Sequence, residues 1–171
     1  MTARRRPPEL VCDREVFRDV IGHFATGVAI VTAREGGVDY GVTVSAVSSL
    51  SLEPPMLLVC LNRSSRTQAA VSRCGSFAVN ILGVAQGELA RRFATSRDDK
   101  FDGVDLVYGA LGHPLLRDAL AHVECRVGEV ATGGTHTVFL SEVLRAERFD
   151  GEPLLYFRGR FGWLTLDRDE R

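Results

Sequence analysis

The chain has 171 residues, of which 45% are hydrophobic and 25% are charged, a composition typical of a soluble globular protein large enough to bury its own core. Its formal net charge of -1 creates no overall field that would attract nucleic acid or an anionic membrane. Its apolar runs fall short of the ~20 residues that cross a bilayer, and no signal-peptide core follows the basic start. We expect one cytoplasmic domain at 13–166, preceded by a disordered arm at 1–12 and followed by a charged tail at 167–171.

Several kinds of site are disfavoured by the absence of their motifs. The four cysteines form no CxxC pair, which is typical of reduced thiols, and the four histidines lack the spacing of metal ligands, so we expect no metal site. The chain contains neither GxGxxG nor a βαβ rhythm, which argues against a Rossmann domain. It also contains no GxSxG nucleophile motif, and Cys60 lies inside an apolar run where a thiol would be inert.

The first third of the chain predicts one helix followed by strands. Asp13 is a good N-cap, and the apolar residues after it recur at helical spacing as far as Thr26-Gly27. Residues 28–33 read as a strand and residues 35–38 as a turn. Residues 40–52 alternate over an unusually long stretch and predict a single strand that Pro54-Pro55 ends. The continuous apolar run at 56–61 predicts a strand covered on both faces.

The remaining elements complete an all-β-dominated pattern with a few short helices. Helices are expected at 64–73 and 84–94, a strand at 77–82 and a long ordered loop at 95–114. Strands at 122–132 and 135–149 form a hairpin around Gly133-Gly134, and short strands follow at 154–157 and 160–166. Seven or more antiparallel strands of this kind predict a closed or partly open β-barrel.

A row of hydroxyl side chains on the 40–52 strand is the first candidate ligand surface. Thr43, Ser45, Ser49 and Ser51 share one face of the expected strand, and that face could simply meet solvent. Two features favour a ligand. Residues 41–52 contain no lysine, glutamate or arginine, and their small side chains would let a planar ligand reach the backbone.

A segment directly after the 56–61 strand is the second candidate. Residues 62–67 read Asn-Arg-Ser-Ser-Arg-Thr, and a Ser or Thr cap before a helix presents free backbone N–H groups at the positive end of the helix dipole. Arg66 adds a charge-assisted donor and Thr67 a hydroxyl. An ordinary capped helix would have the same sequence, so an anion site remains one of two interpretations.

Two further features have ordinary structural explanations. Arg91 and Arg92 suit the C-terminal end of the expected 84–94 helix electrostatically. His136 follows the Gly-Gly turn, where a histidine is commonly a core or interface residue. The residues by themselves therefore indicate a β-barrel with an anion-binding loop.

The order of the segments resembles the short-chain flavin reductase family, whose members are reductase components of two-component flavin-dependent monooxygenases. The resemblance covers residues 17–164 and is carried by the segments 23–32, 41–55, 57–65, 77–82, 89–93, 133–136 and 155–161. It implies an FMN-binding split β-barrel of antiparallel Greek-key type that dimerises, with FMN or FAD near the subunit interface. The implied activity is NAD(P)H-dependent reduction of a flavin that a separate monooxygenase then receives.

The resemblance also assigns residues. The resemblance places Thr43, Ser45 and Ala46 against the flavin ring, with Ser48 and Ser49 nearby. It extends the same ligand-binding surface through the backbone of Cys60, Leu61 and Asn62. It gives the flavin phosphate to Ser65, Arg66 and Thr67, with Arg92 and Phe93 at the phosphate or adenine end, and the nicotinamide nucleotide to His136 and Arg160. No residue is expected to act as an acid or base, since the cofactors supply the chemistry.

Alternatives to the reductase remain open at this point. They are a non-catalytic flavin-binding or electron-carrier protein on the same barrel, a flavin-dependent oxidase or reductase of another small substrate, and a structural protein without flavin. The sequence does not separate FMN from FAD or NADH from NADPH.

Overall fold

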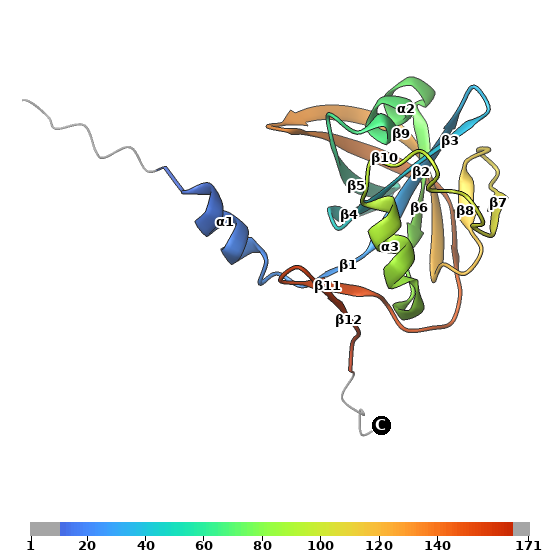
Figure 1. Ribbon diagram of the computed structural model, residues 1–171. Coiled ribbons are helices and arrows are strands. Elements are labelled where there is room, and N and C mark those ends of the chain that lie inside the picture. The colour runs from blue at the N-terminus through green and yellow to red at the C-terminus, as the bar shows by residue number, and fades with distance from the viewer. Residues whose placement is uncertain (1–10, 166–171) are drawn as a thin grey trace, which may run out of the picture.

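The computed structural model describes residues 11–165, so most of the expected arm and all of the expected tail lie outside the described residues. The helices are α1 (Arg14–Ile21), α2 (Arg66–Cys74) and α3 (Gly87–Phe93), the last preceded by a 3₁₀ turn at Val84–Gln86 (Figure 1). The strands are β1 (Thr26–Gly27), β2 (Ala29–Glu35), β3 (Val38–Val44), β4 (Val47–Leu52), β5 (Pro55–Asn62), β6 (Ser76–Ile81), β7 (Leu106–Tyr108), β8 (Pro114–Leu116), β9 (Ala121–Gly133), β10 (His136–Arg148), β11 (Leu155–Phe157) and β12 (Arg160–Gly162).

The strands form one large antiparallel sheet and two small ones. The large sheet has the order β3-β2-β6-β9-β10-β5-β4, and the small sheets have the orders β1-β11-β12 and β7-β8. The prediction of an antiparallel β protein with a few short helices is confirmed. Among residues 11–165 no sheet closes on itself, and β3 and β4 lie at opposite edges of the large sheet although they are consecutive in sequence.

The core fills both sides of β2, whose first five residues are all buried. One cluster packs α2 against the sheet and contains Val31, Val71 and Phe77. The other packs α3 against Ile30 and contains the fully buried Phe93. Strand β2 is therefore the central strand that fixes the position of both helices.

The prediction of one strand over residues 40–52 is wrong. The segment 38–44 pairs with β2, whereas the segment 47–52 pairs with β5, so the chain crosses between two sheet edges at Ser45 and Ala46. A change of pairing partner leaves no mark on the alternation of side chains, and neither glycine nor proline marks this break. The expected single row of hydroxyl groups is consequently divided, with Thr43 before the crossover and Ser49 and Ser51 after it.

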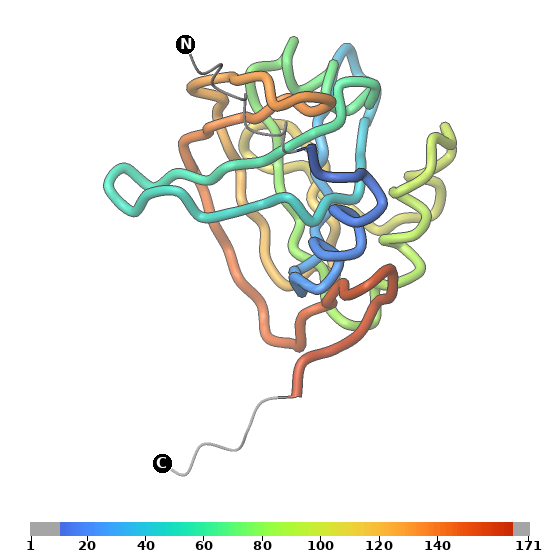
Figure 2. Tube along the Cα trace, turned by 90° about the vertical axis from the view of Figure 1, so that its left-hand side faces the viewer, coloured from blue at the N-terminus to red at the C-terminus, as the bar shows by residue number. Residues whose placement is uncertain are grey.

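The expected burial of β5 on both faces is also wrong for the single chain. Leu57, Val59 and Leu61 are buried, but the alternating side chains of Met56, Leu58 and Cys60 are only half-buried. An apolar run shows that a strand is suited to burial but not what covers it. The β4–β5 hairpin extends beyond the rest of the sheet (Figure 2).

Several element boundaries differ from expectation. Helix α1 ends at Ile21 rather than near Thr26, α2 begins at Arg66, the expected helix at 84–94 divides into a 3₁₀ turn and α3, and β12 ends at Gly162. The turn of the β9–β10 hairpin consists of Gly134 and Thr135, of which Gly134 has a positive φ of 58°. The expected loop at 95–114 contains β7 and the first residue of β8, a hairpin too short to give a periodic pattern.

Buried polar groups anchor the β7–β8 hairpin. The Arg34 N–H donates to Nδ1 of His113 (3.0 Å), so the other ring nitrogen, Nε2, faces the Ser76 hydroxyl at 2.8 Å. The Glu124 carboxylate accepts the Ala110 and Leu111 N–H groups. Burial lowers the pKa of His113, and the negative charge of Glu124 opposes this only in part.

This environment predicts a loss of stability in mild acid. The unfolded chain takes up a proton on His113 below pH ~6.5, whereas the folded chain, with its lowered pKa, resists protonation. The contribution of the neutral His113 ring to the free energy of unfolding is therefore complete above pH ~6.5, and it declines as the pH falls toward the folded pKa of His113. Urea unfolding between pH 7.5 and 5.5 should show this slope, and His113→Gln should be less stable with a flatter slope. Equal slopes in both proteins would contradict the assignment.

Candidate functional site

A hollow of about 750 Å³ lies where three segments meet. It is lined by β3 residues 38–42, by the end of β5 and the start of α2, and by the loop that follows α3. It gathers Asn62, Ser65, Arg66 and Thr67 from the predicted anion-binding segment. The sequence prediction thus coincides with a concave surface of a size suited to a small ligand.

The turn into α2 leaves donors available to a ligand. The side-chain oxygen of Asn62 accepts the N–H (2.9 Å) and the hydroxyl (2.8 Å) of Ser64, which fixes the turn. Ser65 is the N-cap, but its side chain makes no capping hydrogen bond. Its hydroxyl and the first amides of the helix can therefore serve an anion. Thr67 is buried at the floor of this turn.

Three cationic side chains line the hollow, and one of them, Arg97, is paired with Asp99 of its own loop. Arg66 forms an ion pair with Asp98 and donates to the Ser96 carbonyl at 3.3 Å. The Lys100 ammonium donates to the Gly41 and Phe93 carbonyls, both at 3.1 Å. Burial lowers the pKa of Lys100, and the charge of Arg66 adds to this effect. Sequence reasoning missed Lys100 as a site residue, although it is the single lysine in a chain with 21 basic residues.

Arg92 and Phe93 do not line the hollow but hold the loop that follows α3 in place. The Arg92 guanidinium donates to the carbonyls of Asp99 (2.7 Å) and Asp102 (2.6 Å). Phe93 is fully buried and meets Phe101 edge to face, with ring centroids 4.9 Å apart. Both residues therefore fix the loop that carries Asp98 and Lys100.

The residues predicted to line a flavin ring lie along the crossover and β5. The Thr43 hydroxyl donates to the Ala90 carbonyl at 2.7 Å and ties β3 to α3. Ser45 and Ala46 are exposed at the crossover, and the Cys60 N–H donates to the Ala46 carbonyl at 3.0 Å. Ser48 and Ser49 are exposed on β4, whereas Leu61 is buried. Burial raises the pKa of Cys60, which keeps its thiol protonated.

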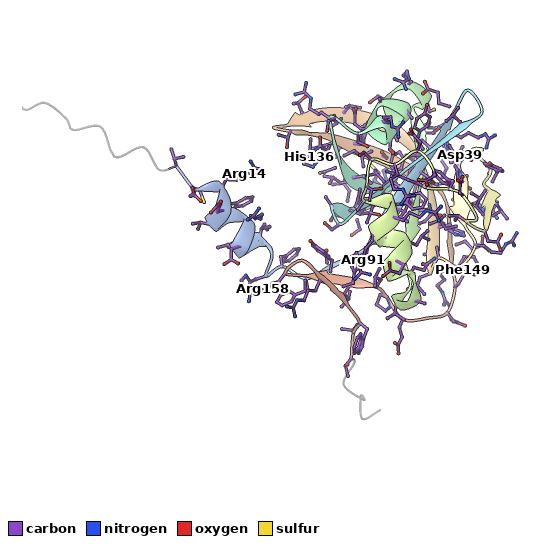
Figure 3. The ribbon with its side chains drawn as sticks, viewed as in Figure 1. Arg14, Asp39, Arg91, His136, Phe149 and Arg158 are labelled. Carbon is purple, nitrogen blue, oxygen red and sulfur yellow. The ribbon has the colours of Figure 1, made fainter. Side chains whose placement is uncertain are left out.

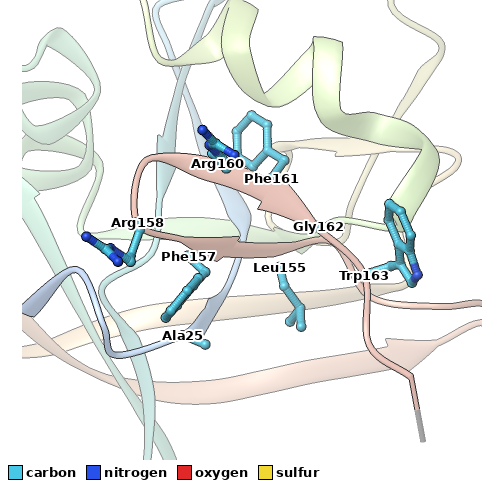
Figure 4. A pocket seen from close by; sticks show the side chains of 8 residues that line it. All are labelled: Ala25, Leu155, Phe157, Arg158, Arg160, Phe161, Gly162 and Trp163. Atoms are coloured by element: carbon cyan, nitrogen blue, oxygen red, sulfur yellow. The ribbon is translucent and has the colours of Figure 1, made fainter.

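His136 and Arg160 lie in different places. His136 is paired with Asn62 across β10 and β5, so it borders this hollow, near the tip of the β9–β10 hairpin (Figure 3). Arg160 lines a second hollow, of about 840 Å³, with Phe157, Phe161 and Trp163. Figure 4 shows Arg160 and Phe161 on one side of the β11–β12 hairpin and Phe157 on the other. A single chain does not bring His136 and Arg160 into one pocket.

The described residues contain neither a metal-binding cluster nor a membrane-spanning helix. Over 11–165, no cluster of three or more histidine, cysteine, aspartate or glutamate side chains is arranged to hold a metal ion. None of the helices in this range has the length and apolarity needed to cross a membrane.

The family described as flavin reductase like domain matches residues 21–165. The chain belongs to this family. Among curated relatives, a reductase component of 4-nitrophenol 4-monooxygenase/4-nitrocatechol 2-monooxygenase from Rhodococcus opacus is 51% identical over 150 residues, covering 88% of this chain and 80% of the relative. An NADH-dependent FAD reductase from Streptomyces globisporus is 40% identical over 172 residues, covering 96% of this chain and 94% of the relative.

Solved structures of the family agree with this assignment. The Streptomyces globisporus NADH:FAD oxidoreductase in complex with NAD and FAD fragments superposes with a TM-score of 0.88 at 39% identity, covering 94% of this chain and 99% of that chain. The flavin reductase component of a bacterial two-component tryptophan halogenase superposes with a TM-score of 0.83 at 32% identity, covering 91% and 100%. The family resemblance identified from the sequence is confirmed.

Proposed function

We propose that the chain is an NADH-dependent flavin reductase that supplies reduced FMN or FAD to a separate monooxygenase. The observation that carries the proposal is the hollow of about 750 Å³ at the start of α2, in a member of the flavin reductase family. Its lining includes Arg66, Lys100 and the N-cap residue Ser65, whose side chain makes no capping hydrogen bond. This donor set fits the phosphate of a flavin. The named activities of the relatives, including NADH-dependent FAD reduction, support the same conclusion.

The protein contributes binding and orientation. When bound, nicotinamide and flavin supply the hydride transfer themselves. Ser65, Arg66 and Thr67 would hold the phosphate, and the crossover at Ser45 and Ala46 would present backbone groups and small side chains to the ring. Ser48 and Ser49, with the backbone of Cys60 and Leu61, would extend that surface. His136, adjacent to Asn62, and Arg160 would orient the nicotinamide nucleotide.

A second copy of the chain would complete this site. Met56, Leu58 and Cys60 on β5 and Val138 and Leu140 on β10 form a half-exposed apolar face, and their pairing makes that face continuous. Covering such a face is a common reason for a symmetric dimer. Because Arg160 lies outside the first hollow of its own chain, we propose that it serves the site of the other copy in this homodimer. The edge positions of the consecutive strands β3 and β4 support a split β-barrel of Greek-key type. We also propose that the protein works in the cytoplasm.

The function is tested by following NADH oxidation with FMN, with FAD, with riboflavin and without added flavin. We expect rapid NADH oxidation only when a flavin is added, and the reduced flavin should then be reoxidised by dissolved oxygen or taken up by an oxygenase. A flavin-bound protein that does not oxidise NADH would instead indicate an electron carrier. Consumption of NADH only with a different small acceptor would indicate another reductase.

Replacement of His136 tests the nicotinamide assignment. His136→Ala should raise the apparent KM for NADH more than it weakens flavin binding, because the side chain borders the hollow without lining it. Steady-state kinetics and a flavin titration give the two quantities. Thr132→Ala, on the exposed tip of the same hairpin, is the matched control. Unchanged NADH kinetics in His136→Ala would remove the proposed role.

A further inference from the structure

The guanidinium of Arg66 is paired with a carboxylate of its own chain. Arg66 and Asp98 form an ion pair, both side chains line the hollow, and both are largely exposed, at 60% and 85%. The same arginine nitrogen also donates to the Ser96 carbonyl. An anionic group therefore already lies at the position where the proposed function places the flavin phosphate.

The loop around Asp98 is fixed by several contacts. Arg92 donates to two of its carbonyls, Arg97 forms an ion pair with Asp99, and the Lys100 ammonium joins the loop to Gly41 on β3. These contacts hold the backbone on both sides of Asp98. The loop therefore holds the backbone of Asp98 beside Arg66, while the exposed Asp98 side chain can still turn into solvent.

We propose that Asp98 is an internal competitor of the flavin phosphate, which lowers affinity for phosphorylated flavins and speeds their release. The proposal rests on the proposed function, since it concerns the same hollow. A bound phosphate must either take Arg66 from Asp98 or lie beside its negative charge. An exposed ion pair contributes little stability, so the exchange is reversible and its effect on affinity is moderate.

Such a competitor suits an enzyme whose product leaves. A reductase that delivers reduced flavin to another protein has to release it within each turnover, and a strong phosphate site would retain it. The negative charge of Asp98 offsets part of the attraction provided by Arg66, Lys100 and the amides of α2. Asp98 thereby determines how long a phosphorylated flavin stays bound.

The experiment compares Asp98→Asn with the unchanged protein, using riboflavin, FMN and FAD as ligands. Equilibrium titration gives the affinities, and stopped-flow displacement gives the rate of FMN release. Asp98→Asn should bind FMN and FAD roughly three- to tenfold more tightly and release FMN correspondingly more slowly. Riboflavin lacks the phosphate, so its affinity should stay within about twofold.

The matched control is Asp150→Asn. Asp150 is also exposed and paired with an arginine, Arg148, but it does not line the hollow, so this variant should bind all three flavins as the unchanged protein does. Circular dichroism melting of both variants shows whether the fold is retained.

The outcomes separate this inference from the proposed function. If the unchanged protein binds FMN more tightly than riboflavin but Asp98→Asn binds FMN equally or less tightly, the competitor role is overturned and the reductase stands. An equal gain for riboflavin, or the same gain in Asp150→Asn, also overturns it. If the unchanged protein neither binds flavin nor oxidises NADH with it, the proposed function itself fails, and the inference with it.

Discussion

Replacing Gly41 with alanine is expected to lower the free energy of unfolding by about 2 kcal/mol and to weaken flavin binding. A Cβ at this buried position would lie 2.5 Å from Cε1 of Phe93 and 3.0 Å from Phe101. Phe93 is fully buried and cannot move aside without disturbing α3. The Gly41 carbonyl also accepts from Lys100, so the strain would reach the hollow.

Gly27→Ala is the control for this substitution. Gly27 also lies in a strand, but an added Cβ there would meet nothing within 4 Å, so its stability should change by less than ~0.5 kcal/mol. Urea unfolding measures both variants, and titration with FMN measures binding. Equal stability of the two variants would show that the Phe93–Phe101 pair adjusts more easily than its burial indicates.

Arg66→Gln is expected to weaken the binding of FMN and FAD by roughly tenfold, because it removes a charge-assisted donor to the phosphate. Riboflavin should bind with nearly unchanged affinity. The loss is smaller than that of an unpaired arginine would be, since Arg66 must first give up Asp98. Equilibrium titration with the three flavins measures this directly.

Arg117→Gln provides the corresponding control. Arg117 forms an exposed ion pair with Asp105 outside the hollow, so its replacement should leave all three affinities unchanged. If Arg66→Gln weakens riboflavin as much as FMN, then Arg66 acts by shaping the loop rather than by binding phosphate.

Elements whose signals are local could be predicted from the sequence. The β9–β10 hairpin was recognisable because strand alternation flanks a glycine turn, and α1 because Asp13 caps it through the Glu15 and Val16 N–H groups. The division of residues 40–52 could not be predicted, because it depends on which strands lie at the two edges of the sheet. Pairing partners are set by the whole chain and not by the segment itself.

The candidate site divides in the same way. The segment 62–67 could be picked out as a candidate anion site because its residues are contiguous and lead into a helix, and the structure places it in the hollow. Lys100 and Asp98 could not be picked out, since the loop after α3 reaches the hollow only through the packing of Phe93 and Phe101. The family resemblance supplied His136 and Arg160, and the single chain separates them. A site that the proposed second copy would complete can be read neither from a local sequence pattern nor from the packing of one chain.

Helix α1 projects from the sheets, and none of its eight residues is buried (Figure 1). Helices this short are marginal in water, so α1 has almost no folding free energy of its own. Val16, Phe17, Val20 and Ile21 are each more than half exposed and would gain stability only when another surface covers them. If the proposed second copy provides that surface, the helix would become a concentration-dependent element, and its amide hydrogen exchange should slow as the protein concentration rises.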